Sequence, residues 1–275
     1  MKKADCDLET KYGKLTEYLR EKGSVAVAFS GGVDSTFLLY AAKEALGSRV
    51  LALTSVSDLV PSREIEEAEE FCKRISVRQI TVPFDEMQVE GFADNPVNRC
   101  YICKKALFQR MISAARQEGM AYIAEGSNLD DDGDYRPGRK AVEELGVLSP
   151  LKENGFTKEE IRILSREFGL PTWDKPSYAC LASRFPYGEM ISREKLKMVE
   201  MAEQYLLDLG FRQMRVRIHG DLARIEIPEG DFERFMQEEI RSQVCLRLKQ
   251  IGFVYSALDL KGYRTGSMNE AIRQE

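Results

Sequence analysis

The sequence has little of what marks membrane, secreted or nucleic-acid-binding proteins. None of its apolar runs approaches the roughly 18 uninterrupted residues of a membrane span. The charged opening at residues 1–5 contains no apolar signal region, so we expect a cytoplasmic protein with no membrane partner. The 45 acidic residues outnumber the 40 basic ones, which argues against a nucleic-acid partner because such a partner requires a basic face.

Histidine occurs only once, as His219, whereas cysteine occurs six times. In a reducing cytoplasm these thiols are available for metal or sulfur chemistry. Cys100, Cys103 and Cys180 are one ligand short of a structural zinc site, but three cysteines can hold a [4Fe-4S] cluster. Alternatively, Cys100 and Cys103 are an ordinary thiol pair that opens a helix, and Cys180 is a single loop thiol. The remaining cysteines fall in helical patterns with apolar neighbours, where we expect them to pack: Cys6, Cys72 and Cys245.

One segment, with the sequence SGGVDST at residues 30–36, predicts a phosphate-binding loop. It lies between an apolar run at residues 25–29 and a helical pattern at residues 37–46. Adjacent glycines let the backbone approach an anion, and the N–H groups of the helix start then point toward it. The loop has neither the lysine of a Walker A motif nor the spread glycines of a dinucleotide fingerprint. The alternative is a Gly-Gly turn that only caps a helix.

This loop resembles the SGGxDS signature of the PP-loop ATP pyrophosphatases, which cleave ATP between its α and β phosphates and adenylate a substrate oxygen. By this resemblance Asp34 would orient Mg²⁺ on the departing pyrophosphate, unless it only caps the helix. Ser55 lies at the end of the second predicted strand, where this fold commonly seats adenine, unless it is only a turn residue. The predicted nucleotide-binding residues are Ser30, Gly31, Gly32, Asp34, Ser35, Thr36, Ser55 and Gly126.

Over the first two thirds of the chain, apolar strand patterns alternate with helical patterns. This order predicts an α/β domain whose parallel sheet is covered by helices on both faces. We expect strands at residues 25–29, 50–54, 78–82 and 122–125, with a shorter one near Val147. We expect helices at residues 35–46, 63–75 and 103–117, and after Pro137. A capping box at residues 157–160 begins a further helix.

After Arg184 the pattern changes to that of a small α+β domain. It predicts a helix at residues 192–209, strands at 213–219 and 223–227, a helix from Asp231 and a strand at 253–258. We therefore expect a PP-loop domain at residues 1–185. Residues 186–275 would form a smaller domain for substrate binding or for assembly of a homo-oligomer.

Further segments extend the resemblance over nearly the whole chain. They are NRCYICKK (98–105), EGSN (125–128), DDDGDYRPGR (130–139), KPSYACLASR (175–184) and GYRTGS (262–267). With the phosphate loop, they resemble the LarE family, the ATP-dependent sulfurtransferases that make the nickel-pincer nucleotide cofactor of lactate racemase. The resemblance implies adenylation of a carboxylate of pyridinium-3,5-biscarboxylic acid mononucleotide, a small-molecule nucleotide, and its conversion to a thiocarboxylate.

By this resemblance Cys180 is the cysteine that handles sulfur. Cys100, Cys103 and Cys180 are similar to the cysteines of members that hold a [4Fe-4S] cluster with a removable sulfide, which implies a partner that donates sulfide. In members where the cysteine stands alone, it surrenders its own sulfur and becomes dehydroalanine. The spacing of the cysteines leaves both routes open.

Arginines are expected to bind the anionic substrate, because a guanidinium group forms a planar fork with a phosphate or carboxylate. Arg184 would act beside Cys180, and Arg215 and Arg217 alternate on one face of a strand, where they either meet a phosphate or form a charged sheet surface. The predicted catalytic residues are Asp34, Cys180 and Arg184. The predicted substrate-binding residues are Arg136, Arg139, Ser183, Arg184, Arg215 and Arg217.

Other functions share parts of this pattern. A PP-loop tRNA thiolase would need a basic RNA-binding surface, which the acidic composition disfavours. A GMP or NAD synthetase would share the ATP loop but would not need the three cysteines. A non-catalytic nucleotide-binding protein would bind ATP without releasing pyrophosphate.

Overall fold

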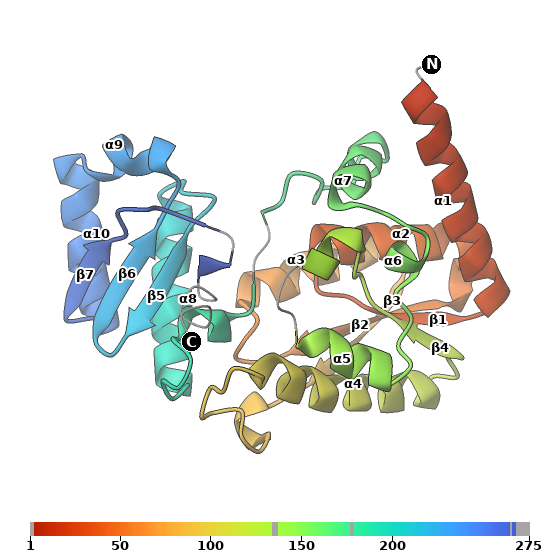
Figure 1. The fold of residues 1–275 in the computed structure, drawn as a ribbon, viewed down its shortest axis with the longest axis horizontal. Coiled ribbons are helices and arrows are strands. Elements are labelled where there is room, and N and C mark those ends of the chain that lie inside the picture. The colour runs from red at the N-terminus through yellow and green to blue at the C-terminus, as the bar shows by residue number, and fades with distance from the viewer. Residues whose placement is uncertain (1–2, 134–136, 177–178, 265, 268–275) are drawn as a thin grey trace. The chain divides into compact units, whose positions relative to one another are not determined.

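The computed structural model describes residues 3–133, 137–176, 179–264 and 266–267 of the chain. The chain divides into two compact units (Figure 1). The first contains residues 1–85 and 98–178, and the second contains residues 86–97 and 179–275. In the part of the chain that is described, no helix is both long and apolar enough to cross a membrane.

The first unit is built on a parallel sheet of four strands. These are β1 (Val25–Ala28), β2 (Val50–Val56), β3 (Arg78–Pro83) and β4 (Tyr122–Ala124), in the order β3-β2-β1-β4. Val25 pairs with Val50 on one side and with Tyr122 on the other. The predicted α/β fold class is thus confirmed. The short strand expected near Val147 is only a single bridge between Ala124 and Leu148, because Pro150, which has no N–H group, soon begins α6 (Pro150–Glu153).

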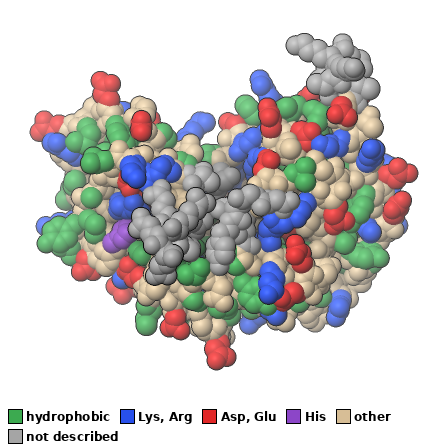
Figure 2. Space-filling view, in the orientation of Figure 1, with side chains coloured by type: hydrophobic (Ala, Val, Ile, Leu, Met, Phe, Trp, Pro, Cys, Tyr) green, Lys and Arg blue, Asp and Glu red, His purple; other side chains and the backbone are tan. Residues whose placement is uncertain are grey.

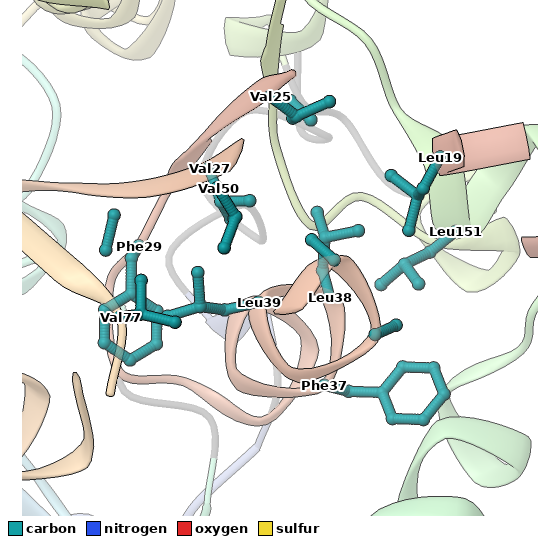
Figure 3. Close-up of a cluster of buried hydrophobic side chains, with 14 of the residues drawn as sticks. Leu19, Val25, Val27, Phe29, Phe37, Leu38, Leu39, Val50, Val77 and Leu151 are labelled. Carbon is teal, nitrogen blue, oxygen red and sulfur yellow. The ribbon is translucent and has the colours of Figure 1, made fainter. Parts of the chain in front are cut away.

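Helices cover both faces of this sheet, as the alternation of strands and helices predicted. One face carries α1 (Lys3–Lys22), α2 (Val33–Leu46), α3 (Ser62–Arg74) and α7 (Lys158–Glu167), and the other carries α4 (Arg99–Gln117) and α5 (Gly138–Glu144). Val25 and Val27 point toward the first group, and Ala26 between them points toward the second. Figure 3 shows Val25, Val27 and Leu39 among the side chains of the first core.

The second unit contains a mixed sheet of three strands in the order β5-β6-β7. β5 (Arg215–His219) and β6 (Leu222–Glu226) are antiparallel, and β7 (Tyr255–Leu258) runs parallel to β6. The turn between β5 and β6 contains Gly220 with φ 57°, a left-handed conformation that glycine adopts without strain. The helices are α8 (Arg193–Asp208), α9 (Phe232–Phe235) and α10 (Glu238–Ile251). This is the α+β arrangement that the sequence predicted.

The surface reflects the near balance of acidic and basic residues. Figure 2 shows Lys and Arg side chains interspersed with Asp and Glu over the visible face of the first unit. Because neither sign of charge dominates this face, surface charge does not locate the functional site. The polar residues that follow the strands are better guides. They lie at the carboxyl ends of β1, β2 and β4, the edge at which open α/β sheets bind ligands.

Candidate active site

The loop between β1 and α2 has the backbone of an anion-binding cradle. Gly31 has φ 71°, which a residue with a side chain rarely adopts, and a Cβ added there would lie 3.5 Å from the Cβ of Ala68. Gly32 is the N-cap of α2 and provides no side-chain cap. The first N–H groups of α2 therefore have no side-chain acceptor at the cap, and these groups can donate to an anion.

Two serine hydroxyl groups stabilise the conformation of this loop, and a threonine hydroxyl group beside them is available to a ligand. The Oγ atoms of Ser30 and Ser35 lie 3.1 Å apart, and Ser35 Oγ donates to the carbonyl of Gly32 at 3.2 Å. Ser35 thus holds the turn closed. Thr36 Oγ1 is buried and has no hydrogen-bond partner among the described residues. An unsatisfied buried hydroxyl next to the cradle is consistent with a polar ligand at this place.

Two further predicted nucleotide-binding residues lie at the ends of β2 and β4, the strands on either side of β1. Ser55 is near the end of β2, and its Oγ is buried without a partner among the described residues. Gly126 follows β4, and a Cβ added there would lie 3.0 Å from the backbone nitrogen of Ser35 and 3.2 Å from the Cβ of Asp34. The absence of a side chain at Gly126 therefore lets the end of β4 pack against the start of α2.

Asp34, in the first turn of α2, is surrounded by groups from distant parts of the chain. Lys158 Nζ donates to Asp34 Oδ2 in a close ion pair, and Asn128 Nδ2 donates to Asp34 Oδ1 at 3.3 Å. Burial raises the pKa of Asp34 above its ordinary value, although Lys158 and Asn128 oppose this shift. The charged carboxylate is thus only partly compensated by its protein partners.

A second lysine contacts the loop itself. Lys175 Nζ donates to the carbonyl of Gly31 at 3.0 Å and to Glu67 Oε2 at 2.7 Å. Its side chain is 13% exposed, so this contact is largely shielded from water. Lys175 therefore supports the left-handed conformation of Gly31 from outside the cradle.

Two of the three cysteines of interest lie in the first unit. Cys100 and Cys103 are half-buried and stand in the first two turns of α4, three residues apart and therefore on one face. The start of α5 packs closely there, since a Cβ added at Gly138 would lie 3.2 Å from the carbonyl oxygen of Cys100. Within each unit taken by itself, the described residues contain no group of three Cys, His, Asp or Glu placed to hold a metal ion.

Cys180 belongs to the second unit, where it is exposed and immediately precedes a short 3-10 helix at Leu181–Arg184. Arg184 is only 1% exposed and pairs through two nitrogens with Glu203 of α8, at 2.8 and 2.7 Å. Its third nitrogen donates to the carbonyls of Ala179 and Cys180 and to Ser183 Oγ. Arg184 therefore fixes the backbone that carries Cys180, and its predicted contact with substrate stays a prediction.

Arg215 and Arg217 lie on β5 and are both buried. Arg217 donates to Glu226 Oε2 and Ser267 Oγ at 2.9 Å and to the carbonyl of Ser183 at 2.7 Å, while its Nε has no partner among the described residues. The guanidinium group of Arg215 lies over the ring of Tyr263. Burial lowers the pKa of both arginines. The structure thus brings Ser183, Arg184, Arg215 and Arg217 into one buried network of the second unit.

The last two predicted substrate-binding residues belong to the first unit. Arg139 donates to the carbonyl of Asp131 at 3.1 Å and lies near Glu143. Arg136 lies outside the described residues. Their contact with substrate stays a prediction.

Comparison with known proteins identifies the family. A PP-loop domain family matches residues 4–134. A pyridinium-3,5-bisthiocarboxylic acid mononucleotide synthase from Lactiplantibacillus plantarum is 37% identical over 269 residues, which cover 96% of each chain. The chain belongs to the LarE family. It is therefore an ATP-dependent sulfurtransferase, as its sequence motifs predicted.

Two other relatives show how far the likeness extends. An uncharacterised protein from Synechocystis sp. is 41% identical to this LarE-family chain over 265 residues. The matched region covers 96% of this chain and 99% of the Synechocystis protein. A GMP synthase from Aeropyrum pernix is 29% identical over 64% of this chain but only 38% of its own length. The likeness to the L. plantarum synthase and to the Synechocystis protein thus extends over nearly the whole chain, whereas the likeness to the GMP synthase covers only part of it.

The residues of this LarE-family protein fit ATP and Mg²⁺, whereas the [4Fe-4S] cluster stays a prediction. The uncapped start of α2 and the orphaned hydroxyl of Thr36 fit the phosphates of ATP, and the carboxylate of Asp34 is a suitable ligand for Mg²⁺. The thiols of Cys100, Cys103 and Cys180 are the donor type that iron-sulfur clusters use.

Sequence reasoning missed four residues that contact the predicted site: Asn128, Lys158, Lys175 and Glu203. Asn128 and Lys175 stand inside motifs that carry the family resemblance, and Lys158 stands inside the capping box, but no local pattern indicates their contacts. Glu203 lies within an amphipathic helix, and no sequence motif indicated that it contacts the predicted site.

Proposed function

We propose that this protein converts a carboxylate of pyridinium-3,5-biscarboxylic acid mononucleotide into a thiocarboxylate, in the biosynthesis of a nickel-pincer nucleotide. The observation that carries the proposal is that the synthase from L. plantarum matches both units, over 96% of this chain. A match limited to the phosphate loop would support only ATP binding.

The first unit is suited to the activation of the carboxylate. A substrate carboxylate oxygen attacks the α phosphorus of ATP, the bond to the bridging oxygen breaks, and pyrophosphate leaves while residues 30–36 bind it. Mg²⁺, held by Asp34, would neutralise charge on the departing pyrophosphate. The N–H groups of α2 are positioned before the reaction, so they stabilise the leaving group without reorganisation. The product is an acyl adenylate, which sulfur attacks at the carbonyl carbon as AMP departs.

The sulfur source is proposed to involve Cys100, Cys103 and Cys180. A [4Fe-4S] cluster on these thiolates would supply a removable sulfide, replenished by a sulfide-donating partner. The alternative is that Cys180 surrenders its own sulfur and becomes dehydroalanine. Its exposed position on a rigidly held backbone supports either route.

The second unit is proposed to bind the substrate phosphate. Among the described residues, its linked charged network contains five arginines and three carboxylates, which places several guanidinium groups close together. The arginines are Arg184, Arg215, Arg217, Arg224 and Arg264, and the carboxylates are Glu203, Glu226 and Asp259. Within the part of the chain that the structure describes, Nε of buried Arg217 has no acceptor, which adds a donor that a ligand can use. Both features favour an anionic ligand.

Pyrophosphate release tests the proposal directly. Wild-type protein, purified without oxygen, is incubated with ATP, Mg²⁺ and the mononucleotide, and pyrophosphate, AMP and thiocarboxylate are measured. We expect all three to form only when the mononucleotide is present. Pyrophosphate release that depends on tRNA would favour a tRNA thiolase, and binding of ATP without pyrophosphate release would contradict an enzymatic role.

Cysteine variants distinguish the two sulfur sources. Iron and sulfide are quantified in wild type and in Cys100→Ser and Cys103→Ser, with Cys245→Ser as the control because Cys245 is exposed on α10. The cluster route predicts bound iron in wild type and in the control, and its loss in the other two variants. Iron-free wild type whose Cys180 loses the mass of one H₂S during turnover would favour the sacrificial route.

A further inference from the structure

Lys158 is the first residue of α7 and contacts the phosphate loop through Asp34. Its backbone N–H donates to Asp130 Oδ2 at 2.8 Å, and the capping box of Thr157 and Glu160 fixes the start of the helix. From this position its ammonium group reaches Asp34, 124 residues away in sequence. The Lys158 side chain is 27% exposed, whereas its backbone is held by the hydrogen bonds at the start of the helix.

The negative charge of Asp34 is unfavourable at a site that binds anions. A carboxylate in the first turn of α2 repels the phosphates that the same turn attracts, unless a cation neutralises it. In the structure Lys158 occupies Oδ2 and Asn128 occupies Oδ1. A Mg²⁺ ion on Asp34 would be repelled by the ammonium group of Lys158, so binding of the metal ion favours departure of Lys158.

Lysine is the partner that can leave and still contribute to binding. Its ammonium group is a compact charge on a flexible four-carbon stem, with three donors that suit phosphate oxygens. Asn128, in contrast, has a short side chain, and its Oδ1 accepts from the backbone N–H of Asp130. Because Lys158 contacts a residue of the cradle itself, a change in its side-chain torsions suffices to redirect it toward a phosphate there.

We propose that Lys158 is a nucleotide-binding residue that exchanges partners. Without nucleotide it neutralises Asp34, and with ATP or pyrophosphate bound it releases Asp34 to the metal ion and donates to a phosphate oxygen. The inference rests on the proposed function in one respect, that residues 30–36 bind ATP. It adds a cation from α7 to a loop that lacks the lysine of a Walker A motif.

Pyrophosphate binding, measured by calorimetry on the full chain, tests this exchange. We compare wild type with Lys158→Gln, Lys158→Arg and the matched control Lys11→Gln. Lys11 forms an ion pair with Glu160 of the same helix, at 2.7 Å and 25% exposure, but contacts no residue of the loop in the described structure. Loss of a hydrogen bond to a charged group predicts about 10- to 100-fold weaker binding in Lys158→Gln. Lys158→Arg should recover part of this loss, and Lys11→Gln should bind like wild type.

Binding of Mn²⁺ alone, measured by electron paramagnetic resonance, tests the second half of the exchange. Without nucleotide, Lys158→Gln should bind Mn²⁺ several-fold more tightly than wild type, because Asp34 Oδ2 is no longer occupied by an ammonium group. Equal pyrophosphate affinity in wild type and Lys158→Gln would overturn the inference, and equal Mn²⁺ affinity would overturn the exchange. If wild type itself binds neither pyrophosphate nor ATP with Mg²⁺, the proposed function fails as well.

Discussion

Glu203 is the position at which we predict the largest loss of stability. It lies in α8 and is only 6% exposed, yet it accepts hydrogen bonds from Arg184 Nε, Arg184 Nη2 and the backbone N–H of Val216, at 2.7–2.9 Å. Burial by itself would raise the pKa of Glu203, but the charge and hydrogen bonds of Arg184 outweigh this effect and lower the pKa. The ionised carboxylate is therefore strongly stabilised in the folded protein.

The substitution Glu203→Gln leaves the guanidinium group of Arg184 charged and buried without its counter-charge. Removal of one partner from a buried ion pair typically costs about 3–5 kcal/mol, and we expect a loss of this size in the free energy of unfolding. The double substitution Arg184→Met and Glu203→Leu removes both charges. It should be markedly less destabilising than Glu203→Gln, because no uncompensated charge then remains.

Urea unfolding followed by circular dichroism measures these differences. The control is Glu69→Gln, which removes an ion pair with Lys73 whose two side chains are 57% and 73% exposed and which should contribute less than about 1 kcal/mol. The stability due to Glu203 is present above the ordinary glutamate pKa of about 4.3 and is lost as pH falls through its lower folded pKa. Glu203→Gln should therefore lose less stability than wild type on acidification. A cost below about 1 kcal/mol at neutral pH would refute this reasoning.

Three further predictions concern packing, thiol reactivity and helix capping. Gly126→Ala should cost about 1–3 kcal/mol and weaken ATP binding, because its Cβ would lie 3.0 Å from the backbone nitrogen of Ser35; thermal denaturation and ATP titration would detect both effects. Burial raises the pKa of Cys72 to about 12, so a thiol reagent at about pH 8 should label the exposed Cys180 and Cys245 in the folded protein and Cys72 only after unfolding, as mass spectrometry would show. Thr157→Ala should destabilise the protein by about 1 kcal/mol in urea unfolding, because the capping box of α7 is lost; an unchanged midpoint would contradict this role.

Features that depend on neighbouring residues were predictable from the sequence. The capping box at Thr157 was correctly predicted because both of its hydrogen bonds join residues three positions apart. The strand, loop and helix around residues 30–36 were predictable for the same reason, since glycine and hydroxyl residues act on the adjacent backbone. The parallel sheet followed from the alternation of strands and helices, which allows few other arrangements.

Contacts between distant segments could not be predicted. Lys158 and Asp34 are 124 residues apart, and Arg184 and Glu203 belong to separate elements. The spacing of the motifs predicts which residue types lie at the edge of the sheet, but not which side chains pair there. The sequence also gave no sign that Arg184 would be buried, because the burial of an arginine depends on a partner that the folded chain provides.

Buried Glu203 and half-buried Asp34 show why a carboxylate indicates a structural role in one unit and a binding site in the other. Glu203 receives three hydrogen bonds, two of them from one guanidinium group, and its pKa is lowered. Asp34 accepts hydrogen bonds only from the flexible side chain of Lys158 and, at 3.3 Å, from the amide group of Asn128 among the described residues. Its pKa is raised because these two donors do not fully offset the effect of burial. Charging Glu203 thus stabilises the fold, whereas charging Asp34 destabilises it as pH rises. A cation that binds Asp34 would remove that cost, so the incomplete compensation of its charge supports the proposal that Asp34 binds a metal ion.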